Sequence, residues 1–147
     1  MQIIEKRKAE VTTKHQTQVL RKFWDSLKQG KITALQCSRC GTYMFPPVPT
    51  CRECLSRDLH WVELSGEGEL LYFTSSPMPA KPFLEFAPYA YGGVRFKEGP
   101  IFLTRIDGVD ISSTETMLKE FERLPIPVRA EIKQVKGLNT ITFKAVR

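Results

Sequence analysis

All four cysteines of the chain lie within eighteen residues as two C-x-x-C pairs, Cys37 with Cys40 and Cys51 with Cys54. Each pair can hold a metal ion from a tight turn whose backbone N–H groups point at the thiolates, and Gly41 supplies the permissive backbone that the first turn needs. Four thiolates fill a tetrahedral shell and leave no position for water, so we expect a structural Zn²⁺ ion. The spacing therefore predicts a small zinc ribbon whose folding depends on the metal.

Three other states of these cysteines are open at this point. Two disulfides would suit an oxidising compartment and are uncommon in cytoplasmic proteins. Free buried cysteines would not require the paired spacing. Iron in a rubredoxin-like site fits the same four ligands and would imply electron transfer.

The net charge of the 147-residue chain is +6, and its distribution divides the sequence into three parts. Residues 1–36 carry +5, residues 37–63 carry zero and residues 64–147 carry +1. We expect a basic leader with a helix, a zinc ribbon and a barrel domain over these three ranges. The sequence contains no apolar run of the roughly 18 residues that span a bilayer, so we expect no membrane segment and a cytoplasmic protein.

Residues 16–29 show the spacing of an amphipathic helix. Its apolar stripe consists of Val19, Leu20, Phe23, Trp24 and Leu27. Gly30 follows the stripe and is expected to end the helix. The stripe either packs within the protein or, with its Phe-Trp pair, anchors the helix to a partner.

After the cysteines the pattern changes to β-strands separated by turn residues. Strands are expected over residues 69–74, 89–96, 101–106, 128–135 and 140–146, and a helix over residues 112–124. Five strands with a helix between the third and the fourth is the order of the OB-fold. The predicted fold is mainly β with an N-terminal helix, in which a rubredoxin-like zinc ribbon is followed by a five-stranded OB-fold barrel.

The first barrel strand and the segment after it have unusual composition. Simple alternation places Leu70 and Tyr72 on one face and Leu71 and Phe73 on the other, so both faces are expected to need cover. Residues 76–93 contain four prolines and four aromatic residues, too much proline for regular structure. We expect a long functional loop there.

The sequence has no recognisable catalytic constellation. Its two histidines are His15, in the leader, and His60, before Trp61 and Val62. Nucleophile-elbow, Walker A and dinucleotide-binding motifs are missing, so we expect no independent enzymatic activity.

Several segments together resemble one family. These are FWDSLKQGKI, CSRCG with CREC, GEGELLYFTSSPMPAKPF and YAYGGVRF. In this order they are similar to the zinc-ribbon plus OB-fold proteins called domain of unknown function thirty-five, described as acyl-CoA-associated. The resemblance covers about residues 16–106; beyond it this chain has a longer helix-like insert and the sequence LPIP at residues 124–127.

The resemblance implies a non-catalytic partner of thiolase-like enzymes that contacts acyl-CoA. In archaeal examples such a protein bridges a thiolase and 3-hydroxy-3-methylglutaryl-CoA synthase. For contacts with CoA we consider four aromatic side chains for stacking and three cationic ones for phosphates: Phe83, Phe86, Tyr89, Tyr91, Lys81, Arg95 and Lys97. Each of these also has an ordinary interpretation as barrel packing or as a solvated surface charge.

The alternative function is binding of single-stranded nucleic acid, which zinc ribbons and OB-folds both perform. Tyr72, Phe73, Tyr89 and Tyr91 would then stack on bases. The nearly neutral barrel argues against this alternative, because a groove that follows a phosphate backbone should be basic. The basic residues 1–15 look instead like a docking arm, for an acidic partner surface or for CoA phosphates.

Overall fold

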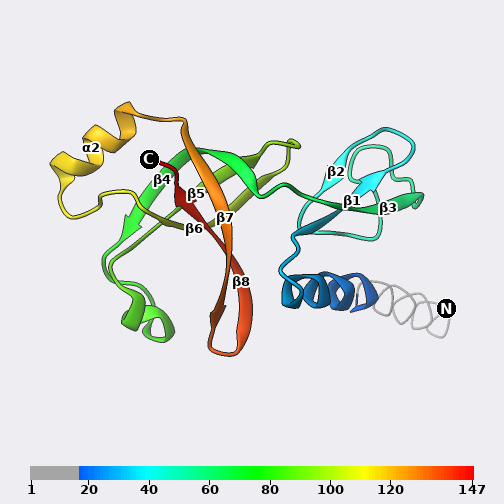
Figure 1. Cartoon of the computed structure of the whole chain (residues 1–147), viewed down its shortest axis with the longest axis horizontal. Helices are drawn as coiled ribbons and strands as arrows, with labels where there is room; N and C mark the ends of the chain where they lie inside the picture. Colours follow the sequence, from blue (N-terminus) through cyan, green and yellow to red (C-terminus); the bar gives the residue numbers. More distant parts are fainter. Residues whose placement is uncertain (1–16) are drawn as a thin grey trace, which may run out of the picture. The chain divides into compact units, whose positions relative to one another are not determined.

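The computed structural model describes residues 17–147, so the predicted docking arm, His15 and Gln16 lie outside the described residues. The chain forms two compact units, one ending at Leu64 and the other spanning Ser65–Arg147 (Figure 1). No helix of the described part is long and apolar enough to cross a membrane.

Residues 17–28 form a helix, as the apolar stripe predicts. Its end is fixed by Gly30, whose φ of 78° is in the left-handed region and whose N–H bonds to the carbonyl of Leu27. Phe23 is buried edge-to-face against Phe45, with ring centroids 5.8 Å apart. Trp24 remains 38% exposed, so only half of the stripe is used for packing within this unit.

Three short antiparallel strands follow this helix. They are β1 (Thr33–Cys37), β2 (Tyr43–Met44) and β3 (Leu59–Glu63), in the order β2-β1-β3. Their core consists of Leu35 and Met44 with the buried Cys37 and Cys51. The apolar core of this sheet is therefore small and includes two of the four cysteines.

The second unit is a closed five-stranded barrel in the order β4-β5-β6-β8-β7, which confirms the predicted OB-fold. Its strands are β4 (Glu67–Ser76), β5 (Tyr89–Phe96), β6 (Ile101–Asp107), β7 (Ile126–Val135) and β8 (Leu138–Ala145). Helix α2 (Thr114–Glu122) lies between β6 and β7 in sequence, as expected. Phe96 and Phe143 are fully buried in the barrel, with ring centroids 5.2 Å apart.

The expected alternation along β4 is wrong at one point. A bulge shifts the register between Leu70 and Tyr72, so Leu71 is an extra residue. Leu70 and Phe73 are consequently both buried, whereas Tyr72 is 55% exposed. Its ring lies over Gly93 of β5, where a Cβ atom would meet the ring carbons.

The proline-rich connection between β4 and β5 contains a regular element that the sequence did not predict. This is the 3₁₀ helix η1 (Lys81–Phe86), with Pro82 in its first turn. Proline suits this position because its fixed φ is helical and its missing N–H is not needed there. None of the residues of η1 is buried.

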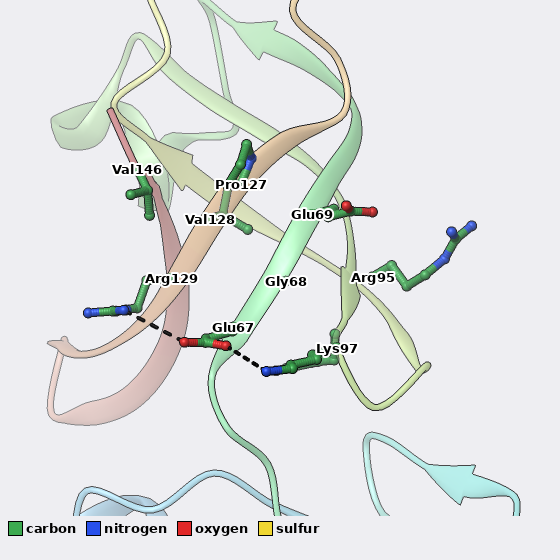
Figure 2. Close-up of a pocket in the computed structure, with 10 residues that line it drawn as sticks. Glu67, Gly68, Glu69, Arg95, Lys97, Pro127, Val128, Arg129 and Val146 are labelled. Atoms are coloured by element: carbon green, nitrogen blue, oxygen red, sulfur yellow. Dashed lines mark hydrogen bonds and ion pairs between the residues drawn. The ribbon is translucent and has the colours of Figure 1, made fainter.

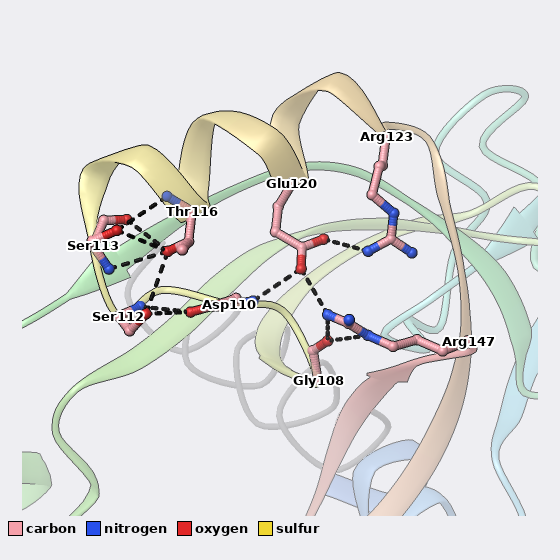
Figure 3. A network of polar contacts seen from close by, with 8 residues as sticks. All are labelled: Gly108, Asp110, Ser112, Ser113, Thr116, Glu120, Arg123 and Arg147. Atoms are coloured by element: carbon pink, nitrogen blue, oxygen red, sulfur yellow. Dashed lines mark hydrogen bonds and ion pairs between the residues drawn. The ribbon is translucent and has the colours of Figure 1, made fainter.

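A buried carboxylate connects α2 to the end of the chain (Figure 3). Glu120 is 5% exposed, and its oxygens lie 2.8 Å from Nη1 of Arg123 and 2.7 Å from Nη2 of Arg147. It also accepts a hydrogen bond of 3.2 Å from the backbone N–H of Asp110. Glu120 therefore joins the helix, the loop before it and the second residue after β8.

We expect the substitution Glu120→Gln to lower the free energy of unfolding of the barrel by about 1–2 kcal/mol. The loss stays moderate because both arginine side chains are about half exposed and regain water. The matched control is Glu115→Gln, because Glu115 forms only an exposed ion pair of 3.3 Å with Lys119 and its loss should not be measurable. Urea denaturation of both variants measures the difference, and equal stability of the two would contradict this role of Glu120.

Candidate metal centre and ligand pockets

The two C-x-x-C segments fold into similar turns. The N–H of Gly41 bonds to the carbonyl of Cys37 at 2.9 Å, and the N–H of Leu55 bonds to that of Cys51 at 3.1 Å. Gly41 has a φ of 77° and Leu55 a φ of 60°, so a leucine occupies the left-handed position in the second turn. That conformation costs a non-glycine residue about 1–2 kcal/mol, which the site must offset.

The turns bring the four Sγ atoms together. The Sγ atoms of Cys37 and Cys54 are 3.6 Å apart, those of Cys40 and Cys51 are 3.5 Å apart, and all four lie within 4.8 Å of one another. A tetrahedral ion with Zn–S bonds of about 2.3 Å requires sulfur atoms about 3.8 Å apart. The geometry of the four donors therefore fits a zinc ion held by Cys37, Cys40, Cys51 and Cys54.

The surroundings of the thiols change their pKa values in opposite directions. The backbone N–H groups of Cys40 and Arg39 lower the pKa of Cys37 despite its burial. The hydroxyl and backbone N–H of Thr42 lower the pKa of Cys40 to about 6. The N–H of Ser56 lowers the pKa of Cys54, but burial and the three neighbouring thiols outweigh it and raise that pKa to about 12. The metal-free cluster thus retains a proton that a bound cation must displace.

Two pockets lie in the barrel unit. The η1 pocket, of about 220 Å³, is lined on one side by Phe83, Phe86 and Tyr89 and on the other by residues of β6, β7 and β8. The β4 groove, of about 540 Å³, is lined by β4, β5 and β7 (Figure 2). In it, Glu67 lies between Lys97, at 3.3 Å, and Arg129, at 3.8 Å.

The seven ligand residues considered from the sequence do not form one site. The η1 pocket contains Phe83, Phe86 and Tyr89, and the β4 groove contains Arg95 and Lys97. Lys81 begins η1 and Tyr91 lies on β5, and neither lines the η1 pocket or the β4 groove. Arg105 and Lys133, which line the η1 pocket, were not considered as ligand residues, although the turn sequence Asp107-Gly108 after β6 marks the strand end where Arg105 lies.

Of the four aromatic residues that were considered for stacking on nucleic acid, one is buried. Tyr72 and Tyr91 are exposed, and the ring of Tyr91 is 6.4 Å from that of Tyr89. Phe73 is buried, and its ring packs at 4.7 Å from Phe121 of α2. Phe73 is therefore not available to stack on a base in this structure.

Comparison with known proteins supports the two-domain organisation. Residues 24–60 match a family model described as ChsH2, rubredoxin-like zinc ribbon domain, and residues 61–132 match one described as ChsH2, C-terminal OB-fold domain. The chain belongs to the ChsH2 family of zinc-ribbon and OB-fold proteins. With the clustered Sγ atoms, this membership identifies the cofactor of the ribbon as structural zinc, and the four cysteines form no disulfide.

Two relatives of this ChsH2-family chain are named DUF35 domain-containing scaffold protein. The one from Pyrococcus furiosus is 26% identical over 111 residues, which are 69% of this chain and 81% of the relative. The one from Methanocaldococcus jannaschii is 27% identical over 78 residues, which are 52% of this chain and 55% of the relative. These names confirm the family resemblance that the sequence motifs indicated.

Solved structures show the same fold. A chain of the structure named Ltp2-ChsH2(DUF35) aldolase has a TM-score of 0.66 and 25% identity, and the match covers 84% of this chain and 91% of that one. A DUF35 protein of unknown function from Sulfolobus solfataricus has a TM-score of 0.56 at 18% identity, over 95% of this chain and 97% of that one. The second likeness shows the fold alone.

We expect the purified protein to contain about one zinc ion per chain and Cys37→Ser to lose it. The ribbon should then lose its order, because its apolar core is small and metal binding supplies its folding energy. Zinc is measured by mass spectrometry and order by amide NMR. Ser38→Ala, in the same turn, is the control and should keep the zinc; a metal-free protein with an ordered ribbon would contradict the assignment.

Zinc affinity should fall with decreasing pH. Between pH 8 and 7 the metal-free Cys54 carries a proton, since its pKa is about 12, so zinc must displace it and affinity should fall about tenfold or more per pH unit. Below pH 6 the protonation of Cys40, with a pKa of about 6, should steepen the dependence. Competition with a chelator of known affinity measures this, and an affinity unchanged between pH 8 and 7 would refute it.

Proposed function

We propose that this protein is a non-catalytic scaffold subunit that binds a thiolase-like enzyme and helps to enclose acyl-CoA. The observation that carries the proposal is the pairing of a zinc ribbon and an OB-fold in one family over residues 24–132. The names of its relatives, scaffold proteins and a partner in an aldolase structure, point in the same direction. The proposal includes a cytoplasmic location.

An exposed apolar surface on the barrel supports the binding of a partner enzyme. Strand pairing places Tyr72, Gly93 and Leu103 in one row across β4, β5 and β6. Tyr91 and Ile101 flank this row on the same face, and Leu103 is 57% exposed. Contiguous exposed apolar side chains of this kind are typical of protein interaction surfaces. We call this set, Tyr72, Tyr91, Gly93, Ile101 and Leu103, the outer row.

The ribbon unit offers a second surface of similar character. Leu20 and Trp24, one helical turn apart, are both exposed on the helix of residues 17–28. Large aromatic side chains are frequent anchors in protein interfaces. A separate apolar surface on each unit would allow the protein to bridge two enzymes, for which we propose a thiolase and 3-hydroxy-3-methylglutaryl-CoA synthase.

Contact with acyl-CoA forms the less direct part of the proposal. Phe83, Phe86 and Tyr89 supply aromatic surface, while Arg95 and Lys97 supply positive charge in the β4 groove. Lys97 already lies 3.3 Å from Glu67, so a phosphate would have to compete with that carboxylate. Lys81 and Tyr91 would contribute only from outside the two pockets.

Affinity purification of the tagged chain from native lysate should recover a thiolase or a synthase subunit. The substitution Leu103→Glu should reduce the recovered enzyme about tenfold or more, because it places a charge in the outer row. Leu138→Glu is the matched control, since Leu138 is an equally exposed leucine of the β8 end. Removal of residues 1–15 should also weaken recovery.

Quantitative mass spectrometry measures the recovered subunits. Recovery of nuclease-sensitive nucleic acid without either enzyme would contradict the proposal and favour the nucleic-acid alternative. An equal loss for Leu103→Glu and Leu138→Glu would show that the outer row is not the binding surface.

A further inference from the structure

The η1 pocket has a lining that selects for the chemistry of its ligand. Phe83 and Phe86 of η1 and Tyr89 of β5 form an aromatic wall. Thr104 of β6 and Ile141 of β8 face this wall. Aromatic rings prefer edge-to-face or offset contacts with another ring, so the wall suits a flat aromatic group.

The volume of the pocket limits the size of that group. An apolar cavity of about 150 Å³ can bind benzene. The 220 Å³ of the η1 pocket therefore accommodates a single ring with a small substituent or two fused rings. A whole nucleotide or a long extended chain exceeds this space, so of acyl-CoA only the two fused rings of the adenine would fit.

The three threonine hydroxyl groups of the lining already donate hydrogen bonds within the barrel. Oγ1 of Thr104 donates to the carbonyl of Ile141 at 2.6 Å. Oγ1 of Thr140 donates to the carbonyl of Lys133 at 3.1 Å, and that of Thr142 to the carbonyl of Glu131 at 3.5 Å. A strongly polar ligand would find these three donors occupied.

The two cations of the lining are also neutralised. Nε of Arg105 lies 3.2 Å from Asp107, and Nζ of Lys133 lies 2.6 Å from Asp107 and 3.2 Å from Glu131. The two positive charges of Arg105 and Lys133 are therefore balanced by the two negative charges of Asp107 and Glu131. An anionic ligand would have to break one of these pairs, whereas an uncharged ligand leaves them intact.

We propose that the η1 pocket binds an uncharged small molecule through one aromatic ring or two fused rings. A recess lined by several separate elements is typical of small-molecule sites. This inference goes beyond the scaffold function and needs neither a partner enzyme nor acyl-CoA.

The aromatic wall is held in place from outside by one lysine. Nζ of Lys136, in the turn between β7 and β8, donates to the carbonyl of Pro82 at 2.5 Å and lies 3.4 Å from Glu85. η1 buries none of its side chains, and on the pocket side the guanidinium of Arg105 lies 5.7 Å from the centre of the Phe86 ring. Lys136 is therefore a positioning residue for the wall.

The test is a titration of the zinc-loaded full chain with indole, followed by amide NMR. Indole should shift the resonances of Tyr89, Thr104 and Ile141, with a dissociation constant of about 1 mM or below. Indole-3-acetate, which adds a carboxylate, should bind at least tenfold more weakly. Equal binding of the two probes, or shifts confined to other residues, would overturn the proposal.

Variants separate the pocket from its surroundings. Val135→Phe fills the pocket and should weaken indole binding at least tenfold, and Phe86→Ala should weaken it severalfold. Leu84→Ala is the control, because Leu84 belongs to η1 but does not line the pocket. An unchanged spectrum outside the pocket shows that each variant is folded, and an equal loss in Leu84→Ala would contradict the site.

Two further measurements test the role of Lys136 and whether the bound aromatic ring belongs to a small molecule or to a side chain of a partner protein. Lys136→Ala should weaken indole binding severalfold and Lys136→Arg should restore it, whereas Lys144→Ala on β8 should have no effect. If N-acetyltryptophanamide bound tenfold more tightly than indole, the ring would belong to a partner's side chain and the small-molecule assignment would be wrong.

Discussion

The ribbon unit depends on four sulfur atoms that repel one another unless a cation lies between them. The Sγ atoms lie within 4.8 Å of one another, and two of them are also part of the small apolar core of the three-stranded sheet. Zinc binding therefore neutralises the charge of the thiolates and also completes the core of the ribbon, two functions that are separate in larger domains. Leu55 in the second turn has a φ of 60°, a backbone conformation that costs a non-glycine residue free energy. Zinc binding offsets this cost, which the small core of the ribbon could not.

Much of this organisation could be predicted from the sequence. The cysteine spacing indicated the ribbon, and the runs of β-branched and aromatic residues between turn signals indicated five strands and α2. What the sequence could not show was the bulge at Leu71, because an extra residue in one strand is defined by its partner strand. The short helix η1 was hidden by its prolines, which are unfavourable inside a helix but suit its first turn.

The candidate ligand residues show a similar limit. Phe83, Phe86 and Tyr89 are close in sequence and share one pocket, whereas Arg95 and Lys97 line a different groove. Tyr89 and Arg95 both lie on β5 but line different pockets, because β5 contributes to two surfaces of the barrel. Likewise, charge counting from the sequence missed that Arg105 and Lys133 are paired with Asp107 and Glu131, which changes the chemistry of the pocket that they line.

The bulge in β4 has a consequence for how the barrel closes. Before it, residues 68–70 pair with both β5 and β7, and after it, residues 72–76 pair with β5 alone among the described strands. The bulge thus lies where β4 changes from pairing with two strands to pairing with one. If Leu71 were instead paired in regular alternation, the phenol of Tyr72 would point into the apolar interior and Phe73 would lie at the surface, so the exposed aromatic surface of this barrel depends on the bulge.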